Sequence, residues 1–347
     1  MKRLCLALFI ALLLVQITVA QNDNRNSQPS NASTPAQSFT SQQLAELEES
    51  KQLTASVIKL YNEGKYDEAL PPAKRALEIR EKILGADNQL IVGDLINLAE
   101  LNIAKEKYGT AQELLERGVK IYEKALGVDS PRIADMLDRL ALVNYARSYP
   151  EKTEKLYLRS LAIREKVYGT DSAEAGKSLA RLAEYYLLKG TYKKAEEVYE
   201  RLLPIREKKT GVNNEALVET LERYACLMRK EKRADEAERM EIRASRLLRI
   251  DLSNAKPDDV GVINGRALDL PKPTYPPEAK AARITGTVVV RLMIDERGRV
   301  IRACSISGPP ELQAASERAA YRARFTPTVI SGVPVKITGI VTYNYKL

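Results

Sequence analysis

The sequence predicts a multidomain protein in which an all-α superhelical array of repeated helix pairs is followed by a small α+β domain. A phrase of the form Ile-Arg-Glu-Lys-x-x-Gly recurs every 42 residues, and each copy ends a stretch with helical spacing of apolar residues. The helical spacing stops near Asp251, where β-branched runs and turn residues take over. The length of 347 residues also exceeds one ordinary core and favours several units.

The N-terminus has the pattern of an export signal. Lys2 and Arg3 precede an apolar run, and Thr18 to Ala20 offer small residues for cleavage. Residues 1–20 are therefore predicted to be a signal peptide, and the alternative is an uncleaved N-terminal anchor. Residues 21–45 are rich in Asn, Ser, Gln and Thr and are expected to form a disordered tether.

Residues 46–250 are predicted to form the helical array. Each repeat holds two amphipathic helices, and neither can bury its apolar stripe without a neighbouring repeat. The glycine that closes each phrase is expected to take the left-handed conformation after a helix, and a good N-cap residue follows three positions later. Fixed repeat positions hold leucines (Leu53, Leu95, Leu137, Leu179, Leu221), alanines (Ala69, Ala111, Ala195, Ala237, with Thr153 as the exception), glycines (Gly85, Gly127, Gly169, Gly211) and caps (Asn88, Ser130, Ser172, Asn214).

This pattern resembles the tetratricopeptide repeat (TPR), in the 42-residue variety typical of kinesin light chains. The resemblance covers residues 50 to about 250 and accommodates five helix pairs. The third copy has Ser148-Tyr149-Pro150 at its turn, so that turn is expected to bend differently.

The TPR resemblance implies a solenoid whose concave face, formed by the first helix of each pair, binds extended peptides. One position per repeat on that face holds Asn97, Arg139, Arg181 and Arg223. This ladder is expected to clamp a carboxylate-bearing partner. The alternative is a solvated edge with ion pairs between repeats.

Residues 251–270 are interpreted as a Pro/Gly/Asp-rich connector, with one short strand over Val260–Ile263. The segments after it predict one antiparallel sheet with helices packed against it. The expected elements are a helix over Tyr275–Arg283, a hairpin formed by the strand from Gly286 and the strand Val300–Ser305, a helix over Glu311–Arg324 and a last strand over Lys336–Tyr345.

These segments resemble the C-terminal domain of TonB-family energy transducers, from about residue 258 or 271 to residue 347. The matching motifs are Pro273-Thr-Tyr275-Pro276, Ile294-Asp-Glu-Arg-Gly298, Ser307-Gly308-Pro-Pro-Glu-Leu312 and Arg324-Phe325-Thr-Pro327. The resemblance implies an envelope domain that adds a strand from a partner to its own sheet edge. By analogy the last strand is that edge, and the candidate partner-binding residues are Lys272, Tyr275, Lys336, Thr338, Ile340, Thr342 and Asn344.

The residue inventory argues against catalysis and against bound cofactors or metals. The chain has no histidine, which removes the commonest general base and zinc ligand. Cys226 and Cys304 lie far apart in different predicted domains, and neither belongs to a Cys-x-x-Cys pair. We interpret both as buried small apolar residues, with a disulfide as the alternative.

The predicted function is therefore that of an exported, non-enzymatic adaptor in the periplasm or cell envelope. The net charge is +9, but the basic residues are interleaved with acidic ones, and this pattern does not indicate nucleic acid binding. Expected partners are envelope proteins or peptides, including an outer-membrane TonB-dependent transporter, with membrane contact only if the N-terminal segment is retained. The alternative is an inner-membrane-anchored TonB-type energy transducer that faces the periplasm and serves outer-membrane transport.

Overall fold

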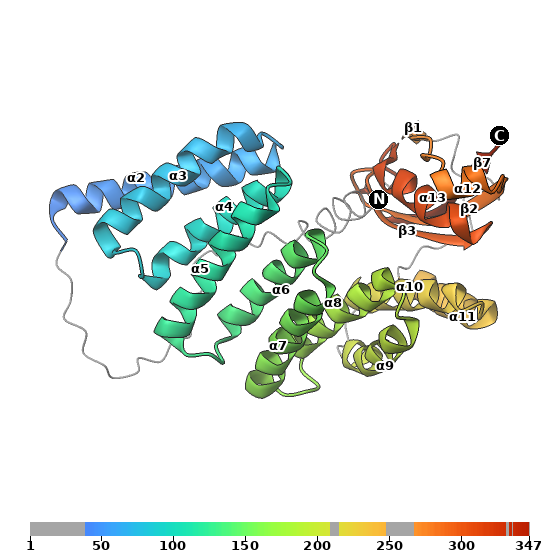
Figure 1. Ribbon diagram of the computed structural model, residues 1–347, viewed down its shortest axis with the longest axis horizontal. Helices are drawn as coiled ribbons and strands as arrows, with labels where there is room; N and C mark the ends of the chain where they lie inside the picture. The colour runs from blue at the N-terminus through green and yellow to red at the C-terminus, as the bar shows by residue number, and fades with distance from the viewer. Residues whose placement is uncertain (1–38, 209–214, 248–266, 331–332, 335, 347) are drawn as a thin grey trace. The chain divides into compact units, whose positions relative to one another are not determined.

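The computed structural model describes residues 39–208, 215–247, 267–330, 333–334 and 336–346 (Figure 1). The predicted signal peptide, the tether before residue 39, the strand over Val260–Ile263 and the repeat positions Gly211 and Asn214 lie outside these residues. The chain divides into two compact units between Ser178 and Leu179. Each unit is described by itself.

The repeat region is a TPR-like helical solenoid, as predicted. The first unit contains α2 (Ser41–Asn62), α3 (Tyr66–Leu84), the short 3-10 helix η2 (Gln89–Ile91), α4 (Val92–Ala104), α5 (Tyr108–Leu126), α6 (Pro131–Ala146), α7 (Pro150–Tyr168) and the start of α8 (Ala173–Lys189). The second unit continues with the rest of α8, α9 (Tyr192–Glu207), α10 (Glu215–Lys230) and α11 (Ala234–Leu247). These helices make the five expected pairs.

The helical region begins earlier than predicted. Residues 41–45 of the expected tether belong to α2, because Thr40 caps the helix. The Thr40 hydroxyl accepts a hydrogen bond from the Gln43 amide, and the Gln43 side-chain oxygen accepts one from the Thr40 amide. This capping box stabilises a first turn that has little apolar content.

The recurring leucines and alanines form the core between paired helices. Leu95, Leu137, Leu179 and Leu221 are buried, as are the four alanines and Thr153. Leu53 in the first pair is only partly buried. Thr153 fits an alanine position because its hydroxyl donates to the Tyr149 carbonyl one turn earlier.

The turn inside each helix pair has the same conformation in all five repeats, so the prediction of a different third turn is wrong. Positive φ angles occur at one repeat position, at Gly64, Glu106, Ser148, Gly190 and Lys232. In the third repeat the Tyr149 amide bonds to the Asn144 carbonyl, as the Lys65 amide bonds to the Leu60 carbonyl in the first. Proline at position 150 is the first residue of α7, where its missing N–H costs nothing.

The glycines that end the second helices differ from the expected left-handed conformation. Gly85, Gly127 and Gly169 have φ of 94°, 82° and 90° but ψ of 150°, 159° and 154°. The φ is positive as predicted, and the ψ is extended, which places them in a region that essentially only glycine adopts. The backbone therefore stops following the helix directly at each of these glycines and continues towards the next repeat.

The recurring Arg-Glu-Lys phrase links neighbouring repeats through ion pairs. Its glutamates pair with an arginine of the next repeat, as in Arg117–Glu81 at 2.7 Å and Arg159–Glu123 at 2.5 Å. Its lysines pair back to the loop of the preceding repeat, as in Lys124–Asp87 at 2.8 Å. The fixed interval keeps these partners in register along the array.

The C-terminal module is a small α+β domain with a three-stranded antiparallel sheet in the order β3-β2-β7. Its elements are β1 (Ala267–Asp269), α12 (Pro277–Ala281), β2 (Gly286–Ile294), β3 (Val300–Ser307), α13 (Pro310–Arg322), β4 (Arg324–Phe325), β5 (Val329–Ile330), β6 (Val333–Pro334) and β7 (Ile337–Tyr345). The predicted hairpin and last strand are confirmed. Residues 267–269 of the expected connector instead form a strand that pairs with β4.

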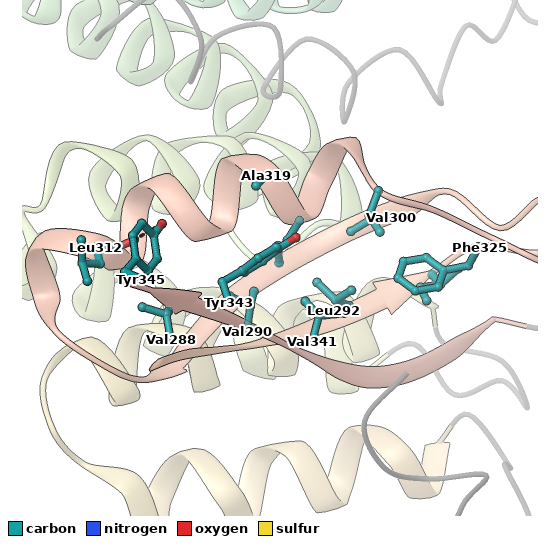
Figure 2. Packing of buried hydrophobic residues seen from close by; sticks show 14 of the residues in the cluster. Val288, Val290, Leu292, Val300, Leu312, Ala319, Phe325, Val341, Tyr343 and Tyr345 are labelled. Atoms are coloured by element: carbon teal, nitrogen blue, oxygen red, sulfur yellow. Dashed lines mark hydrogen bonds between the residues drawn. The ribbon is translucent and has the colours of Figure 1, made fainter. Parts of the chain in front are cut away.

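One face of the sheet packs against α13 (Figure 2). Val288, Val290, Leu292, Val341 and Tyr343 project from β2 and β7 into this core. From α13 the predicted positions Leu312, Ala315 and Ala319 are buried, together with Ala323 just after the helix. Small residues on α13 allow the helix to approach the sheet closely.

Candidate functional site

The two edges of the sheet differ in what lies beside them. On the β3 edge, the Ser305 amide donates to Glu317 Oε1 at 2.8 Å, and Tyr321 hydrogen-bonds with the Ala303 backbone. Both partners come from α13, which therefore closes that edge. On the other edge, no strand within the described residues pairs with the outer side of β7.

The hydrogen-bonding pattern determines which backbone groups of β7 face outward. Opposite residues of an antiparallel pair either exchange both backbone bonds or none, in alternation. The Ser305 amide points to Glu317, away from β2, so Ser305 and its opposite residue Val290 exchange no backbone hydrogen bonds. The backbone groups of Val290 must therefore bond to β7. Its partner there is Val341.

The alternation then assigns the rest of β7. Gly339, Val341 and Tyr343 direct their backbone groups towards β2, since the register is regular over Gly286–Ile294. The backbone groups of the intervening residues point to the outer side. These are four of the predicted partner-binding residues: Thr338, Ile340, Thr342 and Asn344.

A hollow of about 400 Å³ lies beside the C-terminal half of β7. Its walls include Thr342 to Lys346 on one side and Leu270, Lys272 and Tyr275 on the other. Lys272 is exposed at its rim. This hollow lies next to the outward backbone groups.

Tyr275 has a structural role beside this hollow. Its ring meets the Tyr345 ring edge-on, with centroids 5.2 Å apart, and its hydroxyl donates to the Ile284 carbonyl. The side chain thereby ties the Pro273–Pro276 segment to the end of β7.

Lys336 stands just before β7 and pairs with Glu215 at the start of α10, at 2.7 Å. A second carboxylate, Glu296, lies 3.9 Å from the same ammonium. In the structure this predicted partner-binding residue therefore links the beginning of β7 to α10.

The residues of the predicted groove ladder lie on the first helices of their repeats, and two of its arginines form ion pairs. Arg139 on α6 pairs with Glu100 on α4. Arg223 on α10 pairs with Glu184 on α8 at 2.6 Å, with each side chain only 14% exposed. Arg181 also has an interaction, and Asn97 on α4 is partly buried. The inter-repeat ion pairs that the sequence left as an alternative are thus present at two of the four positions.

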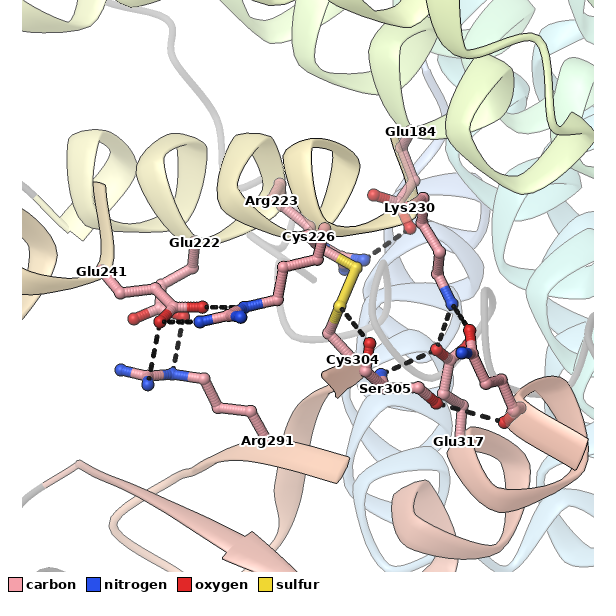
Figure 3. The surroundings of a disulfide bond; sticks show 12 residues. Glu184, Glu222, Arg223, Cys226, Lys230, Glu241, Arg291, Cys304, Ser305 and Glu317 are labelled. Atoms are coloured by element: carbon pink, nitrogen blue, oxygen red, sulfur yellow. Dashed lines mark hydrogen bonds and ion pairs between the residues drawn. A yellow bond between two sulfur atoms is a disulfide. The ribbon is translucent and has the colours of Figure 1, made fainter. Parts of the chain in front are cut away.

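Cys226 and Cys304 form a disulfide between α10 and β3, so the interpretation as separate buried residues is wrong (Figure 3). Their Cα atoms are 5.9 Å apart, a usual separation for a disulfide. The physical reason is that the outer face of the sheet packs on α10 and α11. Met293 of β2 contributes to this interface with Leu217, Val218, Leu221 and Ala244.

Charged side chains surround the disulfide (Figure 3). Arg291 of β2 contacts Glu241 of α11 at 3.2 Å and Glu222 of α10 at 3.7 Å. Burial raises the pKa of Glu222, although the Arg291 charge acts in the opposite direction. Burial acts to lower the pKa of Arg223, but the nearby acidic groups, with Glu184 the strongest among them, together raise it.

Sequence reasoning missed these contacts between α10 and the module because the partners are distant in the chain. The one available signal was that Cys226 and Cys304, the two cysteines outside the predicted leader, could pair with each other. An exported chain favours such pairing, since disulfides persist in oxidising compartments.

Within the described ranges, no three or more His, Cys, Asp or Glu side chains gather where they could hold a metal ion. Among the described helices, none is long and apolar enough to cross a membrane.

Comparison with known proteins agrees with the two-part fold. The family model for the Gram-negative bacterial TonB protein C-terminal domain matches residues 271–347, and a tetratricopeptide repeat model matches residues 59–124 and 132–208. No curated protein matches the chain in sequence.

Two solved structures show the similarity of the repeat fold. BtubC (BKLC) from P. vanneervenii is 20% identical with a TM-score of 0.53, and the match covers 62% of this chain and 91% of that one. The putative kinesin light chain repeats of Podosopora anserina are 19% identical with a TM-score of 0.52, covering 60% of this chain and 98% of that one. The chain thus joins a region that matches the tetratricopeptide repeat model, with a fold similar to these solved structures, to a C-terminal region that matches the TonB C-terminal model.

Proposed function

We propose that the protein is an exported, non-enzymatic adaptor of the cell envelope that binds one partner through the repeat groove and another by strand addition to β7. The observation that carries the proposal is that no described strand pairs with the outer side of β7, towards which Thr338, Ile340 and Asn344 direct their backbone groups. The match to the TonB C-terminal family supports an envelope role, and the repeats support protein binding.

Strand addition explains why the outer side of β7 is arranged as it is. An unpaired edge offers N–H donors and C=O acceptors that an extended segment can match without any reactive side chain. The adjacent hollow between Lys272 and Asn344 gives room for side chains of the added strand. Because α13 closes the β3 edge, β7 is the edge that a partner strand would extend.

The repeat groove is the second proposed surface. Asn97 and Arg139 lie at one repeat position on α4 and α6 of the first unit, and an extended peptide along this row would meet each in turn. The ion pair of Arg139 with Glu100 would then be exchanged in part for a carboxylate of the peptide.

Photo-crosslinking in cells tests strand addition. A photoreactive residue at Asn344, which is exposed, is expected to capture a partner through an extended segment, and Ile340→Pro is expected to abolish that capture. The same photoreactive residue at exposed Glu151 on α7 serves as the matched control. Capture that does not exceed the Glu151 control, or that survives Ile340→Pro, would contradict the proposal.

Export is tested by the mature N-terminus. We expect the mature chain to begin at Gln21 and to remain in the periplasmic fraction, as the predicted cleavage after Ala20 requires. A chain that retains residues 1–20 and pellets with the inner membrane would instead be the anchored transducer. Mass spectrometry of the two fractions distinguishes these results.

A further inference from the structure

The face of α10 that contacts the C-terminal module is the groove face of the last repeat. Arg223 is the α10 member of the ladder that includes Arg139 and Arg181. Glu219, Cys226 and Lys230 lie four, three and seven positions from it, and Glu222 lies three from Glu219 and four from Cys226, so all share one side of the helix. This stripe consists of Glu219, Glu222, Arg223, Cys226 and Lys230.

Nearly every member of this stripe contacts the module. Lys230 reaches Glu317 of α13 at 2.7 Å, and Glu219 pairs with Arg302 of β3 at 2.6 Å. Cys226 is bonded to Cys304, and Glu222 lies near Arg291 of β2 (Figure 3). The module therefore occupies the surface that the other repeats would offer to a peptide.

The non-covalent part of this interface combines ion pairs with a small apolar cluster. Each of these ion pairs keeps part of its side-chain surface exposed, so salt weakens it. Its apolar part centres on Met293 against Leu217, Val218 and Leu221. The disulfide is the covalent connection between α10 and the module in the described residues.

We infer that the Cys226–Cys304 disulfide is a redox latch that holds the C-terminal module over the groove face of the last repeat, and that a dithiol reductant releases the module and uncovers this face. Both cysteines are only partly buried, so neither residue is fully enclosed by the protein. The latch acts on α10 and is independent of the partner that binds β7.

The reaction is a thiol–disulfide exchange. A thiolate of the reductant attacks one sulfur of the protein disulfide, the other protein sulfur leaves as a thiolate, and a mixed disulfide forms. The second thiol of the reductant then displaces the protein sulfur. The protein gains two electrons and two protons as two thiols, and the reductant becomes a disulfide.

Chemical footprinting of the full mature chain tests the latch. Lys230 is 17% exposed in its contact with Glu317, so an amine-acetylating reagent should modify it slowly in the oxidised protein. After reduction by dithiothreitol, we expect its acetylation rate to rise roughly tenfold, because opening of the interface exposes the amine. Lys232, two residues away and exposed, is the matched control and should not change.

Methionine oxidation gives a second measurement from the other side of the interface. Met293 is 4% exposed beneath α10 and α11, and reduction should increase its oxidation by a similar factor. Met136 in α6 is buried in the first unit and should remain protected. The Cys226→Ser/Cys304→Ser double variant should behave like the reduced protein without any reductant.

The outcomes separate a latch from its alternatives. Reactivity that increases at Lys230 and Met293 but not at Lys232 or Met136, in both the reduced protein and the double variant, supports release of the module. Unchanged reactivity at both sites would show that the non-covalent contacts suffice and would overturn the proposal. Reactivity that rises equally at Met136 would show general unfolding and would also overturn it.

Discussion

The Ser305 amide donates to Oε1 of Glu317 at 2.8 Å, and the same oxygen accepts from Lys230 at 2.7 Å. One carboxylate therefore closes the β3 edge and also links α13 to α10. This double role makes β3 unsuitable for strand addition and leaves β7 as the edge for a partner.

Substitutions of Glu317 should separate these two roles. Glu317→Gln keeps an acceptor for the Ser305 amide but loses the charge opposite Lys230, which should cost up to about 1 kcal/mol. Glu317→Ala leaves the amide unsatisfied and should cost about 1–3 kcal/mol. Urea unfolding followed by circular dichroism measures both. Equal losses for the two variants would show that the bond to Ser305 adds nothing.

The buried ion pair between the two helices of the third repeat should contribute more to stability than an exposed ion pair. Arg164 is buried against Asp138 at 2.9 Å, and Arg164→Met should cost about 3–5 kcal/mol because a buried carboxylate loses its counter-charge. The matched change Arg159→Met removes a more exposed pair with Glu123 and should cost about 0.2–1 kcal/mol. Thermal unfolding of the two variants gives the comparison, and similar losses would contradict the burial argument.

The glycine that ends α7 should not tolerate a side chain. Gly169→Ala forces alanine to a φ of 90° and a ψ of 154° and should cost about 1–3 kcal/mol, although no atom crowds the new methyl group. Gly109 in α5 also has open space but no positive φ, so Gly109→Ala should be neutral or stabilise by up to about 1 kcal/mol. Loss of stability in both variants would contradict a conformational cause.

Proline should discriminate the two sides of β7. Ile340→Pro removes an outward N–H and should leave the module folded, whereas Val341→Pro removes a bond to β2 and should unfold it. Near-ultraviolet circular dichroism of the tyrosines reports the state of the module. A module that survives Val341→Pro but not Ile340→Pro would reverse the assignment of the two sides.

The sequence predicted the elements well because their signals are local. The spacing of Leu179, Leu182 and Ala183 predicts a helix without any knowledge of the rest of the chain, and all three side chains are buried. The alternation over Lys336–Tyr345 likewise predicts a strand, and the structure has β7 at Ile337–Tyr345.

The remaining features depend on contacts between distant residues or on neighbouring structure. The disulfide joins cysteines 78 residues apart, and no spacing rule shows that β3 packs on α10. The positive φ of Ser148 was missed because a serine gives no local sign of it, and two hydrogen bonds from the ends of the helix pair impose it. The pairing of Arg223 with Glu184 needed the stacking of α8 on α10.

Amide hydrogen exchange along β7, measured by NMR on the free protein, tests the central claim most directly. The account predicts alternation: slow exchange at Gly339, Val341 and Tyr343, which bond to β2, and fast exchange at Thr338, Ile340 and Asn344. Uniform protection of both sets would mean that the outer side of β7 is already paired, and it would contradict strand addition at this edge.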